Sequence, residues 1–190
     1  MDFMDQTDAV VLVDEHGGAL TDPDGTPRTM AKIEAHRQGR LHLAVSVFIF
    51  NSRDELLLQK RAAHKYHSAD KWTNTCCTHP HPGETPLATA RRRLYEEMGM
   101  RCRLFEAFTF LYRAEVGNGL VENEFDHVFM GFSDRDPRPD PSEVGDWKWV
   151  SLEKLKLEIA RHPADFSPWI VCCFDRVVEC EPRLKEALRD

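Results

Sequence analysis

Residues Lys71 to Met100 read KWTNTCCTHPHPGETPLATARRRLYEEMGM, and they place a cysteine and histidine cluster directly before a charged helix. Thr85 can cap the N-terminus of this helix, Pro86 suits its first turn and Gly99 can end it. Apolar residues recur at helical spacing and would form the buried stripe, namely Leu87, Ala90, Leu94 and Met98. We therefore predict a helix over this second half, with a polar opposite face.

The polar face of the predicted helix carries charges in opposite pairs. Arg92 and Glu96 stand four residues apart, as do Arg93 and Glu97, and this spacing stacks the partners on one face. One interpretation is a solvated, salt-bridged surface, which is common on charged helices. The other is a platform for a metal ion and a diphosphate, since carboxylates bind hard divalent cations and guanidinium groups bind phosphate oxygens as a fork. The neighbouring cysteines and histidines favour the second interpretation.

Length and composition indicate an ordinary globular protein. The chain has 190 residues, of which 42% are hydrophobic and 30% charged, so it can build a real core. We expect a single domain over residues 1–190, with a strand and loop extension at 1–30 and a C-terminal helical region at 170–190. The six cysteines are expected to be reduced, because a chain of this size does not need a disulfide framework.

The charge pattern limits the possible partners. A formal net charge of -7 argues against a nucleic-acid binder, although a local basic pocket can still recruit a small anion. No run approaches the roughly 18 apolar residues of a membrane span, and the N-terminus MDFMDQTDAV is acidic, unlike a signal peptide. We expect a cytoplasmic monomer that binds neither membrane nor nucleic acid.

Apolar runs and turn signals predict an α/β fold. The run LAVSVFIF at 43–50 is typical of a strand buried on both faces, and after a turn at 51–54 the residues 55–59 should return as the second arm of a hairpin. Further strands are expected at 9–15, 104–113, 120–125, 127–132 and 147–150, and helices after Ser151 and from about residue 166. This order predicts helices on both faces of a mixed sheet.

Several residues could form a site, but each has an ordinary explanation when taken alone. Glu122 and Glu124 alternate in a predicted strand, so both carboxylates can reach one ion, or can be the solvent side of an edge hairpin. A lone histidine such as His36 or His42 is more often a surface or core residue than a ligand. The basic run serves either solubility or a diphosphate pocket, and it comprises Lys60, Arg61, Lys65 and Lys71.

Two sequence motifs carry a resemblance to a known family. Glu84, followed after seven residues by RRLYEEMG at 92–99, resembles the Nudix box GX5EX7REUXEEXGU. Thr78 stands where the box has its first glycine, and Arg93 stands where the box has the glutamate that is central to metal-assisted hydrolysis. With the segment WTNTCCTHP at 72–80, these departures resemble the type 1 isopentenyl-diphosphate isomerases, Nudix relatives that isomerise rather than hydrolyse. The resemblance spans roughly residues 36–169 and implies a Nudix-like α/β/α sandwich.

The resemblance also implies a reaction and its metal ions. The reaction is conversion of isopentenyl diphosphate to dimethylallyl diphosphate, a 1,3 hydrogen shift by protonation and deprotonation of the alkene, in isoprenoid synthesis that can include carotenoids. Mn²⁺ or Mg²⁺ would be held by His36, His42, His79, Glu122 and Glu124, a donor set that Zn²⁺ could also occupy adventitiously. A second Mg²⁺ would bridge Glu97 and the diphosphate.

Further residues match the family's catalytic and substrate-binding positions. Cys77, rather than its neighbour Cys76, matches the catalytic thiol, with Glu124 as its opposite partner and Tyr112 beside Glu124. The implied diphosphate clamp and carbocation partner are Lys32, Arg61, Lys65, Arg93 and Trp169. Two rivals remain: a Nudix-type diphosphohydrolase, which the change to Arg93 disfavours, and a scaffold in which histidines and thiolates hold structural zinc.

Overall fold

The fold is built around a mixed sheet. The computed structural model describes residues 9–187, and within them seven strands form one sheet in the order β5-β4-β3-β8-β7, with β6 beside β3 and β9 beside β4. Only the β3–β8 pair among these neighbours is parallel. The strands are β3 (His42–Phe50), β4 (Glu55–Arg61), β5 (Trp72–Thr73), β6 (Cys76–Thr78), β7 (Leu104–Gly117), β8 (Leu120–Phe132) and β9 (Val144–Ser151).

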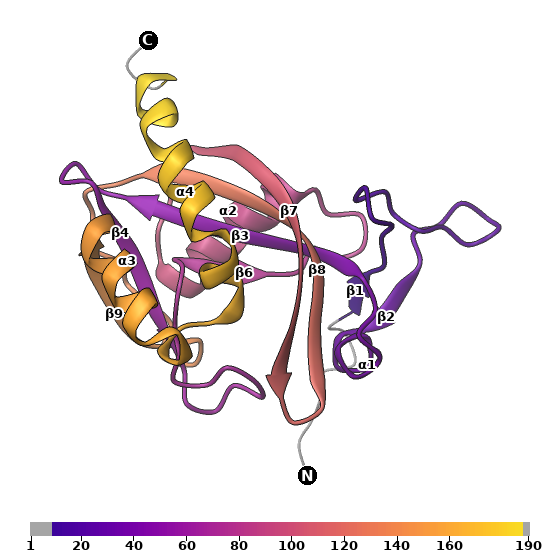
Figure 1. The fold of residues 1–190 in the computed structure, drawn as a ribbon. Helices are drawn as coiled ribbons and strands as arrows, with labels where there is room; N and C mark the ends of the chain where they lie inside the picture. The colour runs from indigo at the N-terminus through magenta and orange to yellow at the C-terminus, as the bar shows by residue number, and fades with distance from the viewer. Residues whose placement is uncertain (1–8, 188–190) are drawn as a thin grey trace.

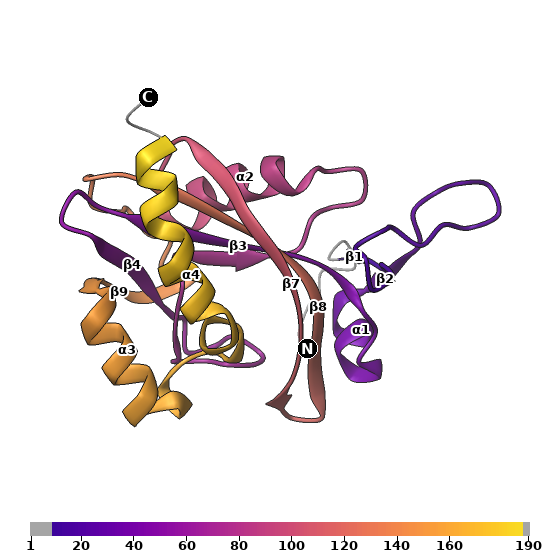
Figure 2. The same ribbon diagram turned by 45° about the horizontal axis from the view of Figure 1, so that its top comes forward.

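Helices cover both faces of this sheet, as the sequence predicts. Helix α2 (Pro86–Met98) lies on one face, and α3 (Leu152–Arg161) and α4 (Pro168–Ala187) lie on the other, an arrangement seen most clearly in Figure 2. The central strand β3 serves both cores, since Val47 packs in the cluster under α2 and Phe48 in the cluster under α4. Strand β3 is therefore buried on both faces, and the α/β class with a mixed sheet is confirmed.

Helix α2 begins and ends where its sequence signals predict. The Thr85 hydroxyl accepts a hydrogen bond from the Ala88 amide at 3.3 Å, and Gly99 ends the helix in a left-handed conformation with φ 64°. Arg92 donates two hydrogen bonds of 2.8 Å to the carboxylate of Glu84. This forked contact fastens the loop that precedes α2 to the body of the helix.

The predicted hairpin of β3 and β4 is wrong for most of its length. The two strands pair at Phe50 and Leu56 and then diverge, and β4 pairs instead with β9. Thr75 fills the gap: its hydroxyl accepts from the Ile49 amide at 2.9 Å and donates to the Leu57 carbonyl at 2.8 Å. Asn74 and Thr75 are thus buried polar residues between the short strands β5 and β6.

The N-terminal part lies to one side of the main sheet, as Figure 1 shows. Strand β1 (Ala9–Val11) pairs with β2 (Thr29–Ala31) in a separate two-stranded sheet and is shorter than the predicted strand at 9–15. Helix α1 (Lys32–Gln38) follows, which the sequence pattern did not predict, and it ends at Gly39 with φ 59°. Residues 1–8 and 188–190 of the two predicted terminal regions lie outside the described part of the chain. Within residues 9–187, no helix is long and apolar enough to cross a membrane.

Candidate active site

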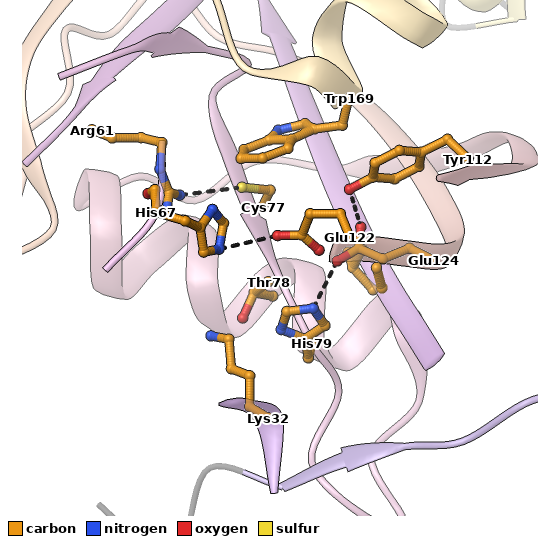
Figure 3. Close-up of a pocket in the computed structure, with 12 residues that line it drawn as sticks. Lys32, Arg61, His67, Cys77, Thr78, His79, Tyr112, Glu122, Glu124 and Trp169 are labelled. Atoms are coloured by element: carbon orange, nitrogen blue, oxygen red, sulfur yellow. Dashed lines mark hydrogen bonds and ion pairs between the residues drawn. The ribbon is translucent and has the colours of Figure 1, made fainter. Parts of the chain in front are cut away.

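A pocket opens on the face of the sheet that also carries the start of α4. The pocket is partly open to solvent, and its space of about 40 Å³ holds a few water molecules. Figure 3 shows that Trp169 lies on one side of this pocket and Lys32 on the opposite side. The lining residues are Lys32, Ala44, Val45, Arg61, His67, Cys77, Thr78, His79, Tyr112, Glu122, Glu124 and Trp169.

Five potential metal ligands converge beside this pocket, and three of them, His79, Glu122 and Glu124, line it. They come from separate elements: His36 from α1, His42 from β3, His79 from the end of β6, and Glu122 and Glu124 from β8. Their nearest ligand atoms all lie within 4.8 Å of one another. The structure therefore brings together the whole set that the family resemblance implied, and the two strand carboxylates share one face as predicted.

The hydrogen bonds of two imidazoles orient their other ring nitrogens toward the cluster, as binding of a cation requires. Nδ1 of His36 lies 2.6 Å from the Lys32 carbonyl and Nδ1 of His42 lies 2.8 Å from the Arg40 carbonyl. Because a carbonyl oxygen only accepts, each Nδ1 carries a hydrogen atom and donates the hydrogen bond. Each Nε2 then faces the ligand group, with His36 Nε2 3.1 Å from a Glu122 oxygen. Nitrogen lone pairs and carboxylate oxygens that crowd together in a buried space need a proton or a metal ion between them.

Cys77 and Glu124 rise from the same face on strands that flank β3. Cys77 is the register partner of Ser46 on one side of β3, and Glu124 is the partner of His42 on the other. Their backbones are therefore offset by two strand spacings, about 10 Å, across the sheet and by four residues, about 13 Å, along β3, and the small side chain of Ala44 lines the pocket between these two levels. Cys76 points to the opposite face, where it packs in the core under α2.

Burial and local partners set different protonation states for this pair. Burial raises the pKa of the Cys77 thiol to about 12, although Arg61 opposes the shift. Burial also opposes ionisation of Glu124, but hydrogen bonding, with His42 foremost, outweighs it and lowers the pKa of this carboxyl to about 2. Tyr112 donates a short hydrogen bond to Glu124, and burial raises the pKa of this phenol well above its usual value. At neutral pH the sulfur thus holds a proton and the carboxyl does not.

The predicted diphosphate-binding cations fall into two groups. Lys32 and Arg61 line the pocket, and the buried Nε of Arg61 has no hydrogen-bond partner among the described residues. Lys65 and Arg93 do not line it; both are ion-paired with Glu143 instead, Arg93 at 3.4 Å. The two groups adjoin, because the Ala62 amide next to Arg61 donates to the Glu143 carbonyl at 3.1 Å.

Glu97 lies with the second group. Its side chain accepts from Arg93 at 2.8 Å and from the Gln59 amide at 2.9 Å, and it is almost fully buried on the α2 side of the sheet. Burial raises the pKa of Glu97, while Arg93 and Gln59 oppose this shift. Glu97 is therefore separate from the His and Glu cluster, as its predicted role at a second ion requires.

Trp169 lines the pocket as the resemblance implied. The indole is 3% exposed, and its Nε1 donates to the Asn74 side chain at 3.0 Å. The Arg61 guanidinium lies 5.3 Å from the ring centroid. Trp72, in contrast, is not in the pocket lining, and the ammonium group of Lys148 lies 4.4 Å from its ring centroid.

Sequence reasoning missed three polar residues near the site. His67 lies in the pocket with its Nε2 3.0 Å from a Glu122 oxygen, and burial lowers its pKa to about 3. Glu143 lies between two cations, which lower its pKa despite its burial. Asp126 is buried, accepts from the Ser46 hydroxyl at 2.6 Å and leaves Oδ1 without a partner among the described residues. Its alternation with Glu122 and Glu124 in the sequence was the signal that could have found it.

Comparisons with known proteins identify the class to which this fold and site belong. The model of the NUDIX domain matches residues 40–170. Among solved structures, the Deinococcus radiodurans protein DR0079 superposes with a TM-score of 0.66 over 88% of this chain and 98% of its own, at 19% identity. A MutT protein from Methanosarcina mazei gives a TM-score of 0.59 over 72% of this chain and 91% of its own, at 23% identity. At these sequence identities, the superpositions show that the fold is shared and do not show a shared function.

Sequence relatives narrow the class further. Isopentenyl-diphosphate Delta-isomerase 1 of Aromatoleum aromaticum is 53% identical over 91% of this chain and 94% of its own length. Isopentenyl-diphosphate Delta-isomerase 2 of the same organism is 49% identical over 91% and 88%, and the enzyme of Pectobacterium atrosepticum is 46% identical over 88% and 90%. The chain therefore belongs to the isopentenyl-diphosphate Delta-isomerases of the NUDIX superfamily.

Proposed function

We propose that this protein converts isopentenyl diphosphate to dimethylallyl diphosphate in isoprenoid synthesis. The observation that carries the proposal is the placement of Cys77 and Glu124 on two sides of one pocket, above the floor at Ala44. The isolated alkene of the substrate is a weak base, so the reaction needs an acid on one side of a flat hydrocarbon and a base on the other. Cys77 and Glu124 are the groups in this pocket that can fill these positions.

The shift is balanced in protons and electrons. A proton adds to the terminal alkene carbon, whose π electrons form the new C–H bond and leave a tertiary carbocation. A second group then removes a proton from the allylic carbon, and the electrons of that C–H bond form the new double bond. Because the reaction runs in both directions, each of the two groups acts as acid in one direction and as base in the other. Such placement typically contributes 10²–10⁴-fold to the rate.

Divalent metal ions complete this proposal. Mn²⁺ or Mg²⁺ at the His and Glu cluster would hold Glu124 in place and offset its charge, and His36, His42, His79 and Glu122 would complete the shell. A second Mg²⁺, at Glu97, would neutralise the diphosphate. Tyr112, hydrogen-bonded to Glu124, keeps the reacting oxygen oriented and can exchange a proton with it.

Cationic side chains would fix the diphosphate tail. Arg61 supports this role most strongly, because its buried Nε lacks a partner among the residues described. Lys32 lies on the side of the pocket opposite Trp169 (Figure 3). Lys65 and Arg93 both pair with Glu143, whose carbonyl accepts from the amide of Ala62, the residue after Arg61. Fixing the tail positions the alkene between Cys77 and Glu124.

Trp169 is proposed to stabilise the carbocation with its π face. Such contacts are worth about 2 kcal/mol or more where water is excluded, and the indole is buried. We expect Trp169→Phe, which keeps an aromatic face, to lose less turnover than Trp169→Ala. Steady-state kinetics of the two variants give the comparison, and equal losses would argue against π stabilisation.

A diphosphohydrolase is the alternative that a NUDIX fold raises. Arg93 occupies the box position where the hydrolases have a glutamate, and here it forms ion pairs with Glu96, Glu97 and Glu143. A guanidinium there supports neutralising a phosphate that stays intact rather than activating water. The expected cytoplasmic location and monomeric state stay predictions.

The decisive assay incubates the protein with isopentenyl diphosphate and Mg²⁺ or Mn²⁺ and follows proton and phosphorus NMR spectra. We expect the two methyl resonances of dimethylallyl diphosphate to appear while the diphosphate signals persist. Release of phosphate or pyrophosphate would support the hydrolase instead, and an unchanged spectrum with either metal would overturn the proposed function.

A further inference from the structure

The imidazole of His67 is not one of the five clustered ligand groups, yet it contacts one of them directly. Its Nε2 lies 3.0 Å from Oε1 of Glu122, whereas His36 Nε2 lies 3.1 Å from the other oxygen, Oε2. Glu122 is 2% exposed and His67 6% exposed, so water competes little for this contact. Figure 3 shows His67 reaching across the pocket to Glu122 from the side of Arg61.

The chemistry of the two groups fixes the direction of this hydrogen bond. A carboxylate can only accept a hydrogen bond, so Nε2 of His67 carries a hydrogen atom and donates a hydrogen bond to Oε1 of Glu122. The remaining oxygen, Oε2, is then the one directed at the cluster. Ligand carboxylates and imidazoles depend on such outer partners for their orientation, and loss of one typically lowers metal affinity 10–100-fold.

The surroundings of His67 hold its ring in this orientation. Its backbone carbonyl accepts from Arg61 at 3.3 Å, and its ring meets the Trp169 and Tyr66 rings edge to face, at 6.2 Å and 4.4 Å between centroids. The contact to Glu122 is therefore made by a packed side chain rather than by a flexible one. A ring held this way costs little further entropy when it orients a ligand.

We propose that His67 is a positioning residue of the metal site, which holds Oε1 of Glu122 by an N–H donor and so presents Oε2 to a divalent ion. This inference rests on the metal site of the proposed function. It concerns a residue on the segment between β4 and β5, which begins directly after Arg61 and also carries Lys65. The metal centre and the expected diphosphate clamp thus share one supporting segment.

The test measures Mn²⁺ binding without substrate, by the EPR signal of free Mn²⁺. We expect His67→Ala to raise the Kd for Mn²⁺ about 10–100-fold. His67→Gln retains an N–H donor at similar reach and should stay within about threefold of the wild-type Kd. The matched control is His64→Ala, an exposed histidine on the same segment, which should bind Mn²⁺ like the wild type.

Two results would overturn the proposal: an unchanged Kd in His67→Ala, or a loss in His67→Gln as large as that in His67→Ala. The second result would mean that the imidazole itself, as filler or direct ligand, is required. Circular dichroism of the metal-free variants reports folding, and His67→Met, which fills space without donating, replaces the alanine variant if that one does not fold.

A kinetic readout separates this inference from the proposed function. If His67 acts through metal affinity, the turnover of His67→Ala recovers at saturating Mn²⁺, whereas a turnover that stays low at full occupancy would count against it. If the wild type forms no dimethylallyl diphosphate, the proposed function fails, but the Mn²⁺ titrations still decide the role of His67.

Discussion

Two charged clusters lie on opposite faces of the same sheet, and they are built in different ways. On the α2 face three carboxylates meet cations: Glu84 pairs with Arg92, and Glu97 and Glu143 pair with Arg93. On the pocket face, three imidazoles and two carboxylates place their ligand atoms within 4.8 Å of one another, and the cations Lys32 and Arg61 lie elsewhere on the pocket wall. The carboxylates on the α2 face are neutralised by neighbouring arginines, whereas the His and Glu cluster on the pocket face has the ligand groups to bind a metal cation.

This difference indicates that, within a NUDIX fold, the proposed reaction takes place on the face opposite the box helix. The box helix, whose glutamates support hydrolysis in the family pattern, here uses Arg92 to fasten the loop at Glu84, while Arg93 and Glu97 are left for the proposed diphosphate site. The reacting pair lies instead on the opposite face, where β6 and β8 flank β3. Changes to Cys77, Glu124 or the clustered ligands should therefore abolish activity or weaken metal binding, whereas a change to the Glu84–Arg92 pair should cost only stability.

The largest expected effect is that of Cys77→Ala. Removing one of the two proton-handling groups should lower turnover by about 10²–10⁴-fold or more, with the fold retained. Glu124→Gln should be similarly inactive. The measurement is kcat with isopentenyl diphosphate at saturating metal.

Cys76→Ala is the matched control, because this adjacent thiol points into the core under α2. It should reduce stability while leaving most of the turnover. Wild-type rates in Cys77→Ala, or an equal loss of turnover in Cys76→Ala, would contradict the claim that only the thiol on the pocket face takes part in the reaction.

The next largest effect is on Mn²⁺ affinity, which should fall for a variant in the pocket cluster and stay unchanged for a variant on the α2 face. Glu122→Gln removes a charged ligand and should weaken Mn²⁺ binding by more than the about 10–100-fold expected for loss of an outer partner, whereas Glu84→Gln, which removes the same charge from the other face, should not change it. Calorimetric titration of metal-free protein makes the comparison. Equal affinities for the two variants would show that net charge, rather than the cluster, controls binding.

A smaller effect concerns the buried carboxyl beside the pocket. Ser46→Ala removes the hydrogen bond to Asp126, whose other oxygen already lacks a partner among the described residues. The free energy of unfolding should fall by about 1–3 kcal/mol in urea titrations. Ser142→Ala, at an exposed position, is the control and should change stability by much less. A neutral Ser46→Ala would contradict the account of this contact.

The smallest effect is that of Glu84→Gln on stability. Its forked pair with Arg92 is partly exposed, so we expect a loss of about 1 kcal/mol at neutral pH. The hydrogen bond from Arg92 lowers the pKa of Glu84 from 4.5 to about 2. The contribution is therefore complete above pH 4.5 and is lost as the pH falls toward 2. Unfolding of both proteins between pH 7 and pH 3 should show the difference shrinking, and a constant difference would refute the ion pair.

Much of the fold could be predicted because local signals agree with the tertiary structure. Thr85, Pro86 and Gly99 mark α2 correctly, and the apolar run of β3 predicts its burial on both faces. The shared face of Glu122 and Glu124 follows from strand alternation alone. The ligand set as a whole came from family resemblance, since His36 and His42 have no local pattern that identifies a ligand.

The remaining features depend on contacts between distant parts of the chain. Thr75 is a polar residue in a segment that reads as a loop, and its bonds to β3 and β4 exist only after those strands diverge. His67 lies in a turn-rich segment, and its contact to Glu122 joins residues far apart in sequence. Helix α1 is short, and its interactions with β8 outweigh its weak local signal.

The central claim is that Cys77 and Glu124 move protons on two sides of one five-carbon unit, and isomerisation in deuterated water tests it most directly. The account predicts dimethylallyl diphosphate with solvent deuterium in a methyl group, an intact diphosphate, and no labelled product from Cys77→Ala or Glu124→Gln. Product that forms without solvent deuterium, or labelled product at the normal rate from either variant, would contradict it.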